Sequence, residues 1–194
     1  MHDLTQQYWN KRYVNDDFGW DLGEVSKPLK VYIEQLTNKD LTILIPGAGN
    51  SYEAEFLYNL GFKNVFVLDF AEEPLQNIKE RMPQFPSTQL VQQDFFNHQG
   101  QYDLIIEQTF FCAINPSLRQ QYVNHMKQLL KPNGKLVGLL FNDVLNIDKP
   151  PFGGNKEEYK ALFSNLFNIK LMETAYNSIK PREGRELFVM IQNK

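Results

Sequence analysis

Two glycines and an aspartate are the residues of this chain whose types and spacing best fit a binding chemistry. Gly47 and Gly49 follow a run of aliphatic residues at 41–45, and Asp69 ends a second such run at 64–68. Glycine lets a backbone turn pass close to a ligand where a Cβ atom would clash. A carboxylate at the end of the next strand can accept hydrogen bonds from both hydroxyls of a ribose. The pattern therefore predicts a nucleoside site.

Position 52 narrows the choice of nucleoside. A dinucleotide fingerprint has a third small residue there, so that the next helix can approach a pyrophosphate. This chain has Tyr52 instead, which disfavours a nicotinamide cofactor. We therefore expect S-adenosylmethionine as the cofactor, with S-adenosylhomocysteine as its product.

Composition excludes several classes of protein. The chain has 194 residues, of which 42% are hydrophobic and 22% charged, and we expect a single globular domain over residues 1–194. A net charge of −3 without a basic run disfavours a nucleic-acid partner. No apolar segment approaches the ~20 residues of a membrane span, and the first residues do not resemble a signal peptide. We expect a cytoplasmic monomer that acts on a small molecule.

Metal and thiol chemistry are also disfavoured. The three histidines are scattered and the chain has one cysteine, so we expect neither a metal site nor a disulfide. The neighbours of Cys112 are apolar, and we interpret this residue as a small buried hydrophobic group rather than a nucleophile.

Apolar runs alternate with longer amphipathic stretches, which is typical of an α/β fold with a mostly parallel sheet. The expected strands cover residues 41–45, 64–68, 89–91, 102–106, 134–141, 169–172 and 187–191, with a tight turn at 131–134. The expected helices cover residues 26–36, 51–60, 71–82, 117–130 and 156–166. Residues 1–25, rich in Trp and Tyr, lie outside this pattern, and we interpret them as a lid over the donor site.

Short segments along nearly the whole chain resemble the thiopurine S-methyltransferase-like family. They are residues 9–13, 19–24, 28–29, 46–49, 68–69, 94–96, 109–114, 130–134, 150–152 and 181–186. The pieces Gly-Trp-Asp-Leu-Gly and Phe-Phe-Cys-Ala-Ile are the most specific. The closest resemblance is to the branch of plant halide and thiocyanate methyltransferases, the "harmless to ozone layer" group.

This resemblance implies a class I S-adenosylmethionine-dependent methyltransferase fold. That fold is a Rossmann-like, doubly wound sheet of seven strands, one of them antiparallel, with the donor at the carboxyl ends of the strands. Electron-rich rings and carboxylates stabilise the positive charge of the donor sulfonium. The residues that the resemblance assigns to the donor are Trp9, Tyr13, Trp20, Gly47, Gly49, Asp69, Asp94, Phe95 and Thr109.

The loop after the expected strand 102–106 enters the crevice toward which the methyl group of the donor points. The plant relatives have Asp-Tyr where this chain has Glu107 and Gln108, so an amide replaces a ring beside the sulfonium. We expect the acceptor pocket to include Phe18, Trp20, Gln108, Phe110, Phe111 and Phe152. Arg119, Arg182 and Arg185 are possible anchors for an anion.

The sequence contains no persuasive pair of histidine and carboxylate, so we predict no catalytic acid or base and a role of positioning alone. A nucleophile that is anionic at neutral pH needs no general base for in-line displacement at a sulfonium. We therefore predict methyl transfer to a small soft nucleophile: a thiol, bisulfide, thiocyanate or a halide. Two alternatives stay open, a non-catalytic protein that binds S-adenosylmethionine and a methyltransferase for a metalloid oxyanion.

Overall fold

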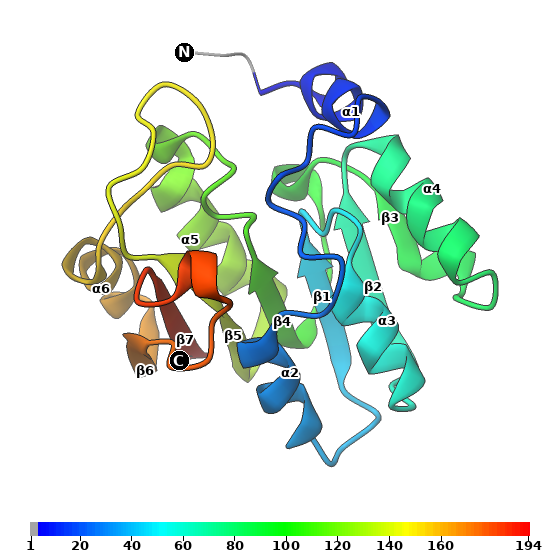
Figure 1. The fold of residues 1–194 in the computed structure, drawn as a ribbon. Helices are drawn as coiled ribbons and strands as arrows, with labels where there is room; N and C mark the ends of the chain where they lie inside the picture. Colours follow the sequence, from blue (N-terminus) through cyan, green and yellow to red (C-terminus); the bar gives the residue numbers. More distant parts are fainter. Residues whose placement is uncertain (1–3) are drawn as a thin grey trace. The chain divides into compact units, whose positions relative to one another are not determined.

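The computed structural model describes residues 4–194, which form two compact units (Figure 1). The first unit extends to His98 and the second runs from Gln99 to Lys194. The expectation of one domain over residues 1–194 stays a prediction. Residues 1–3 of the expected lid lie outside the described residues.

Three parallel strands form the sheet of the first unit: β1 (Thr42–Pro46), β2 (Asn64–Asp69) and β3 (Leu90–Gln92), in the order β3-β2-β1. Pro46 pairs with Leu68, the residue before Asp69. This register brings the glycine turn after β1 and the carboxylate that ends β2 to the same edge of the sheet. The apolar runs of β1 and β2 are largely buried, as expected for strands covered on both faces, whereas no residue of β3 is fully buried.

The helices of the first unit are α1 (Gln6–Val14), α2 (Lys27–Glu34), α3 (Tyr52–Asn59) and α4 (Glu72–Arg81), with two short 3₁₀ turns, η1 (Ser87–Gln89) and η2 (Phe95–Asn97). The sequence analysis did not predict α1. Thr5 caps this helix by accepting a hydrogen bond from the N–H of Tyr8. Helix α1 packs against α4, with Asn10 accepting a hydrogen bond from the N–H of Glu72.

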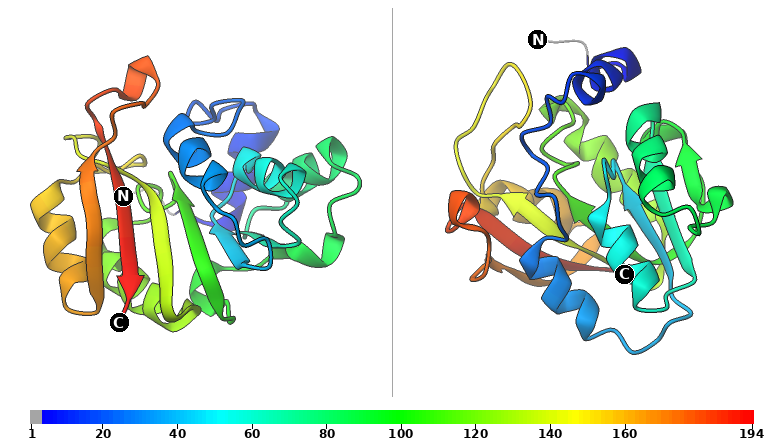
Figure 2. Two further views of the ribbon diagram at one scale, coloured as in Figure 1. Left: turned by 90° about the horizontal axis from the view of Figure 1, so that it is seen from below. Right: turned by 45° about the vertical axis from the view of Figure 1, so that its right-hand side comes forward.

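Four strands form the sheet of the second unit: β4 (Tyr102–Gln108), β5 (Leu130–Phe141), β6 (Phe167–Thr174) and β7 (Glu186–Asn193), in the order β4-β5-β7-β6. Strands β4 and β5 are parallel, and β7 is antiparallel to both of its neighbours. The left view of Figure 2 shows these four strands side by side. All seven expected strands are therefore present, with one strand reversed.

The second unit also contains the helices α5 (Arg119–Leu129) and α6 (Lys156–Ser164) and the 3₁₀ turns η3 (Pro116–Leu118) and η4 (Lys180–Arg182). The expected turn at 131–134 was wrong as a boundary, because β5 begins before it, at Leu130. Tyr102 pairs with Leu130 across this bend, and Asn133 adopts a φ of 64° within it. Main-chain pairing thus extends the strand through a sequence that favours a turn.

Within residues 4–194, no helix combines the length and the apolar character needed to cross a membrane. The described residues also contain no group of three or more His, Cys, Asp and Glu side chains placed to hold a metal ion.

Candidate functional site

The glycine turn after β1 and Asp69 at the end of β2 form the centre of the candidate donor site. Gly47 and Gly49 both have a positive φ, of 55° and 52°. The N–H of Gly49 donates to Oδ2 of Asp69 at 3.0 Å, and the N–H of Ala71 donates to Oδ1 at 2.9 Å. These bonds hold the carboxylate against the turn.

Asp69 is buried, with 8% of its surface exposed. Burial raises the pKa of Asp69 to about 6, although hydrogen bonds from three backbone N–H groups oppose this shift. The side chain is therefore mostly ionised at neutral pH. Each carboxylate oxygen has further lone-pair capacity, so Asp69 can still accept hydrogen bonds from ribose hydroxyls.

Four aromatic residues of the N-terminal segment, Trp9, Tyr13, Phe18 and Trp20, pack together and are called the aromatic cluster below. Trp20 contacts Trp9 and Tyr13 edge to face, with ring centroids 5.6 and 5.8 Å apart, and Tyr13 stacks on Phe18 at 5.7 Å. Trp20 also forms a hydrogen bond to the hydroxyl of Tyr13. Burial, and then the charge of Asp69, raises the pKa of Tyr13 well above its usual value.

The aromatic cluster lies directly against the glycine turn. A Cβ atom at Gly49 would lie 2.7 Å from the hydroxyl oxygen of Tyr13 and 4.0 Å from Nε1 of Trp20. Glycine is therefore needed at this position both for its positive φ and for space. The fold thus brings Trp9, Tyr13 and Trp20 to the same place as Gly49 and Asp69.

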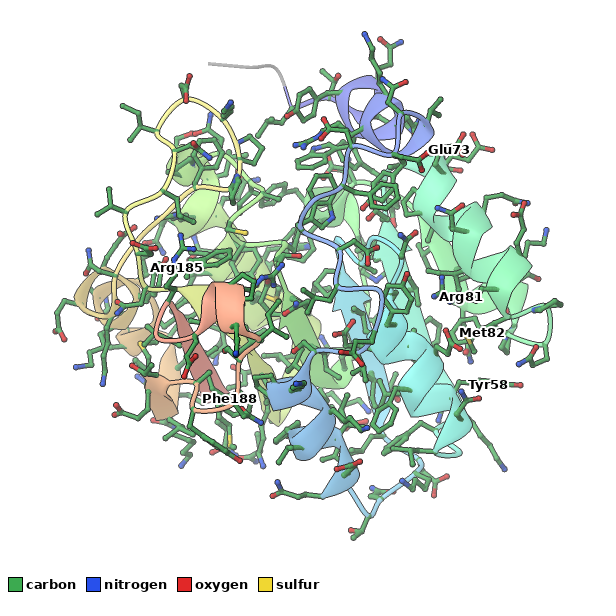
Figure 3. The ribbon with its side chains drawn as sticks, in the orientation of Figure 1. Tyr58, Glu73, Arg81, Met82, Arg185 and Phe188 are labelled. Atoms are coloured by element: carbon green, nitrogen blue, oxygen red, sulfur yellow. The ribbon has the colours of Figure 1, made fainter. Side chains whose placement is uncertain are left out.

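The sequence analysis missed the hydrogen bonds that hold Asn50 at the end of the glycine turn. Its side chain donates to Asp21 at 2.5 Å and accepts from Asn77 at 3.0 Å. Its carbonyl accepts from Arg81, which also forms an ion pair with Glu55 at 2.6 Å. Figure 3 labels Arg81 on α4. These five polar residues come from three separate parts of the chain and leave no local pattern, so no sequence signal points to this network.

Arg12 is a second residue that the sequence analysis did not single out. Its guanidinium lies 4.5 Å from the ring centroid of Trp20 and forms an ion pair with Asp17 at 3.0 Å. This arrangement fixes one face of Trp20 against α1.

Asp94 and Phe95 lie just beyond β3. Asp94 is exposed and caps η2 by accepting a hydrogen bond from the N–H of Phe96 at 2.8 Å, whereas Phe95 is buried. The N–H of Gln93 donates to the carbonyl of Asp69 at 3.1 Å, which places this segment next to the end of β2. Their expected contacts with the donor stay a prediction.

In the second unit, Glu107 organises the loop that follows β4. Its side chain is fully buried. Oε1 accepts hydrogen bonds from the N–H groups of Phe110 and Phe111 at 2.8 and 2.9 Å, and Oε2 accepts one from the hydroxyl of Tyr122 at 2.8 Å. Burial raises the pKa of Glu107 to about 7 against these three bonds. The sequence analysis noted the position of Glu107 but assigned it no role.

The loop after β4 contains a strained residue. Thr109 has a φ of 62°, a conformation that a β-branched residue rarely adopts. Its hydroxyl donates to the carbonyl of Gln108 at 2.7 Å. The bonds from the next two residues to Glu107 hold this turn in place, and strain of this kind is common where a loop contacts a ligand.

The structure separates the expected pocket residues of the second unit into two groups. Gln108, Thr109 and Phe110 are half-buried, whereas Phe111 and Phe152 are each 1% exposed. Phe111 packs edge to face on Tyr122 and Tyr159. Contact of any of these residues with an acceptor stays a prediction.

Cys112 is buried, as expected for a small hydrophobic group. Its thiol donates to the carbonyl of Thr109 at 3.1 Å, and its own carbonyl accepts from the N–H of Phe152 at 2.7 Å. Burial raises the pKa of Cys112 to about 12, so the thiolate is scarce at neutral pH.

The three arginines considered as anion anchors each contact a carboxylate of the chain. Arg119 pairs with Glu158 at 2.6 Å, Arg182 pairs with Glu186 at 3.3 Å, and Arg185, labelled in Figure 3, pairs with Asp143. Arg119 also donates to the carbonyl of Gly153 at 2.7 Å. These contacts favour a structural role for the arginines.

Comparison of the sequence with protein families identifies the fold and the donor. The model of the family "Thiopurine S-methyltransferase (TPMT)" matches residues 4–192. The chain belongs to the thiopurine S-methyltransferase family. It is 26% identical to "Probable thiol methyltransferase 2" of Arabidopsis thaliana, over 96% of this chain and 84% of that protein. It is also 26% identical to the thiopurine S-methyltransferase of Vibrio campbellii, over 81% of each chain.

Solved structures confirm the expected class I methyltransferase fold. The 1,6-didemethyltoxoflavin-N1-methyltransferase of Burkholderia thailandensis, with bound S-adenosylhomocysteine, superposes with a TM-score of 0.78 at 15% identity, over 98% of this chain and 87% of that chain. The magnesium protoporphyrin IX methyltransferase of Synechocystis PCC 6803 gives a TM-score of 0.73 at 12% identity, over 100% and 99% of the chains. The protein is a methyltransferase of the thiopurine S-methyltransferase type that uses S-adenosylmethionine on a small-molecule substrate.

The residues of the first unit fit this donor. A buried carboxylate faces a glycine turn, as a ribose site requires, and electron-rich rings lie beside it, where a sulfonium would be stabilised.

Proposed function

We propose that this enzyme transfers a methyl group from S-adenosylmethionine to a small soft nucleophile: a thiol, bisulfide, thiocyanate or a halide. The relatives named as thiol and thiocyanate methyltransferases, both 26% identical to this chain, support this class of acceptor. In this proposal the donor contacts Trp9, Tyr13, Trp20, Gly47, Gly49, Asp69, Asp94, Phe95 and Thr109. The acceptor pocket includes Phe18, Trp20, Gln108, Phe110, Phe111 and Phe152.

The observation that carries the proposal is that the buried carboxylate of Glu107 is fully engaged in hydrogen bonds within the chain. A carboxylate with a pKa of about 7 would suit a general base. Both of its oxygens, however, accept hydrogen bonds from the loop and from Tyr122, and the side chain is fully buried. The following residues 108–112 contain neither a carboxylate nor an imidazole. An acceptor that is already anionic at neutral pH requires no base here.

The chain then contributes binding, orientation and exclusion of water. S-adenosylmethionine supplies a methyl group on a positively charged sulfur, which is an activated leaving group. Holding the acceptor in line with the methyl carbon removes most of the entropic cost of their encounter. Removing water from an anion costs less for large, polarisable sulfur and halide ions than for small hard ones, which favours soft acceptors in an aromatic pocket.

Headspace mass spectrometry tests this function. Purified enzyme with S-adenosylmethionine is sealed with iodide, thiocyanate, bisulfide or a volatile thiol in separate vials. We expect methyl iodide, methyl thiocyanate, methanethiol or the methyl thioether above the level of vials without enzyme. Calorimetry with S-adenosylhomocysteine confirms that the donor site is intact. Donor binding without any of these products would overturn the proposal.

A further inference from the structure

Gln108, the last residue of β4, carries a polar atom that the chain leaves unsatisfied. Its side-chain oxygen Oε1 is buried and has no hydrogen-bond partner among residues 4–194. An unpaired buried carbonyl lowers the stability of a folded protein. Such a cost in a folded enzyme calls for an explanation, and a bound ligand is one.

The donors nearest to Gln108 in sequence already have other partners. The N–H groups of Phe110 and Phe111 donate to Glu107. The hydroxyl of Thr109 donates to the main-chain carbonyl of Gln108 rather than to its side chain. The loop therefore holds its own donors away from this amide.

The position of Gln108 in the second unit is that of a ligand contact. It pairs with Leu139 in the parallel ladder of β4 and β5, at the carboxyl end of β4. In open α/β sheets, ligands bind outside this end of the strands. The strained residue Thr109 follows immediately, with its turn secured by the bonds to Glu107.

We propose that the amide oxygen of Gln108 accepts a hydrogen bond from the acceptor molecule. Gln108 thereby favours sulfur nucleophiles that carry a hydrogen-bond donor over bare anions. This inference rests on the proposed function and names the acceptors that it prefers. A thiolate that also carries a hydroxyl group, such as that of 2-mercaptoethanol, is such an acceptor, since the hydroxyl can donate. Iodide and thiocyanate carry no hydrogen and leave the oxygen unpaired.

The transfer itself balances without a base. The thiolate sulfur forms a bond to the methyl carbon while the bond from that carbon to the donor sulfur breaks. The electron pair of the broken bond stays on the donor sulfur, which becomes a neutral thioether. The products are the methyl thioether of the acceptor and S-adenosylhomocysteine, and the step releases no proton. Gln108 holds the hydroxyl hydrogen of the acceptor throughout, which orients the thiolate.

Substitution of Gln108 by methionine tests this role. Methionine has a similar length and removes both polar ends of the amide, so the result does not depend on which way the amide points. We measure kcat/KM of wild type and variant with 2-mercaptoethanol and with iodide. The ratio of the 2-mercaptoethanol value to the iodide value is expected to fall about three- to tenfold, as for loss of one hydrogen bond. Gln120→Met, at an exposed position of α5, is the control and should leave this ratio unchanged.

A pair of thiols of nearly equal size gives a second comparison. 2-Mercaptoethanol carries a hydroxyl where 1-propanethiol carries a methyl group. The preference of the wild type for 2-mercaptoethanol should shrink in Gln108→Met, and comparing the two enzymes cancels the difference in thiol pKa. The melting temperature supplies a readout apart from turnover. It should stay equal or rise, because the variant removes an unpaired buried oxygen.

The outcomes separate this inference from the proposed function. An unchanged ratio with active enzyme overturns the role of Gln108 alone. A higher ratio also overturns it, since the amide would then donate to bare anions. A lower melting temperature of both Gln108→Met and Gln108→Leu would contradict an unpaired Oε1 and would overturn the inference. Gln108→Leu also repeats the kinetic test if the methionine variant does not fold. Absence of turnover by the wild type with every acceptor overturns both proposals.

Discussion

The backbone N–H of Gly49 donates a hydrogen bond to Oδ2 of Asp69 at 3.0 Å, which joins the turn after β1 to the end of β2. This bond orients the buried carboxylate before any ligand binds. It also joins a glycine and an aspartate at two strand ends into one structural unit.

Replacement of Asp69 by alanine should weaken donor binding more than tenfold. The change removes the acceptor for two ribose hydroxyls, and hydrogen bonds to a charged group contribute about 1.5–3 kcal/mol each. Calorimetry with S-adenosylhomocysteine measures the effect. Asp148→Ala, at an exposed position, is the control. Equal affinity of wild type and Asp69→Ala for S-adenosylhomocysteine would show that Asp69 does not bind the donor.

Asp69 should also make stability depend on pH. Its pKa is raised from 3.8 to about 6 in the folded protein, so the native state binds the proton more tightly than the unfolded chain does. The contribution of this group to the free energy of unfolding therefore falls as the pH rises from about 4 to about 6. Asp69→Asn should abolish this decline. Urea titrations should show the wild type losing about 3 kcal/mol relative to Asp69→Asn across this window. A pH-independent difference would contradict the raised pKa.

Gly49→Ala should disturb the aromatic cluster. The new Cβ would lie 2.7 Å from the hydroxyl oxygen of Tyr13, and the backbone φ of 52° is unfavourable for alanine by about 1–2 kcal/mol. Tyr13→Phe removes that oxygen, so the double variant should recover part of the lost stability but keep the backbone strain. Chemical denaturation of the four proteins measures the coupling. Gly19→Ala is the control, because a Cβ there has open space.

The N-terminal segment, residues 4–25 of the expected lid, should respond to the donor. Trp20→Ala removes the ring that contacts Trp9, Tyr13 and Arg12, and should weaken donor binding about tenfold and lower kcat. Trp20→Phe keeps a ring face and should lose less. Hydrogen exchange in this segment should slow when S-adenosylhomocysteine binds. Unaltered kinetics of Trp20→Ala would show that this segment packs on the fold but does not contribute to donor binding.

Glu107 should matter through its oxygens rather than through its charge. Glu107→Gln keeps one acceptor for the N–H groups of Phe110 and Phe111 and can donate to Tyr122, so acceptor KM should stay near that of the wild type. Glu107→Ala removes the acceptor of both N–H groups, that of Phe111 being buried, and should cost about 2–4 kcal/mol of stability, with a higher acceptor KM. Steady-state kinetics and denaturation measure both effects. Inactivation of a stable Glu107→Gln variant would instead mark Glu107 as a base.

Local sequence patterns determined much of the fold. The aliphatic runs predicted all seven strands, and the residues at the ends of β1 and β2 predicted S-adenosylmethionine as the cofactor, which the family confirms. Both signals are local, because alternation of apolar runs with turns depends only on neighbouring residues. The apolar neighbours of Cys112 likewise indicated its burial.

Only the tertiary structure decided which side chains become partners. Ser51 lies at the expected start of α3, yet its side chain forms no capping bond there. The contact of Tyr13 with Gly49, the hydrogen bonds of Asn50 and the use of Glu107 by its own loop join residues with no shared sequence pattern. The physical reason is that hydrogen bonds and ring contacts depend on distances of a few ångströms, which packing of whole elements sets, whereas periodicity records only which face of an element is buried.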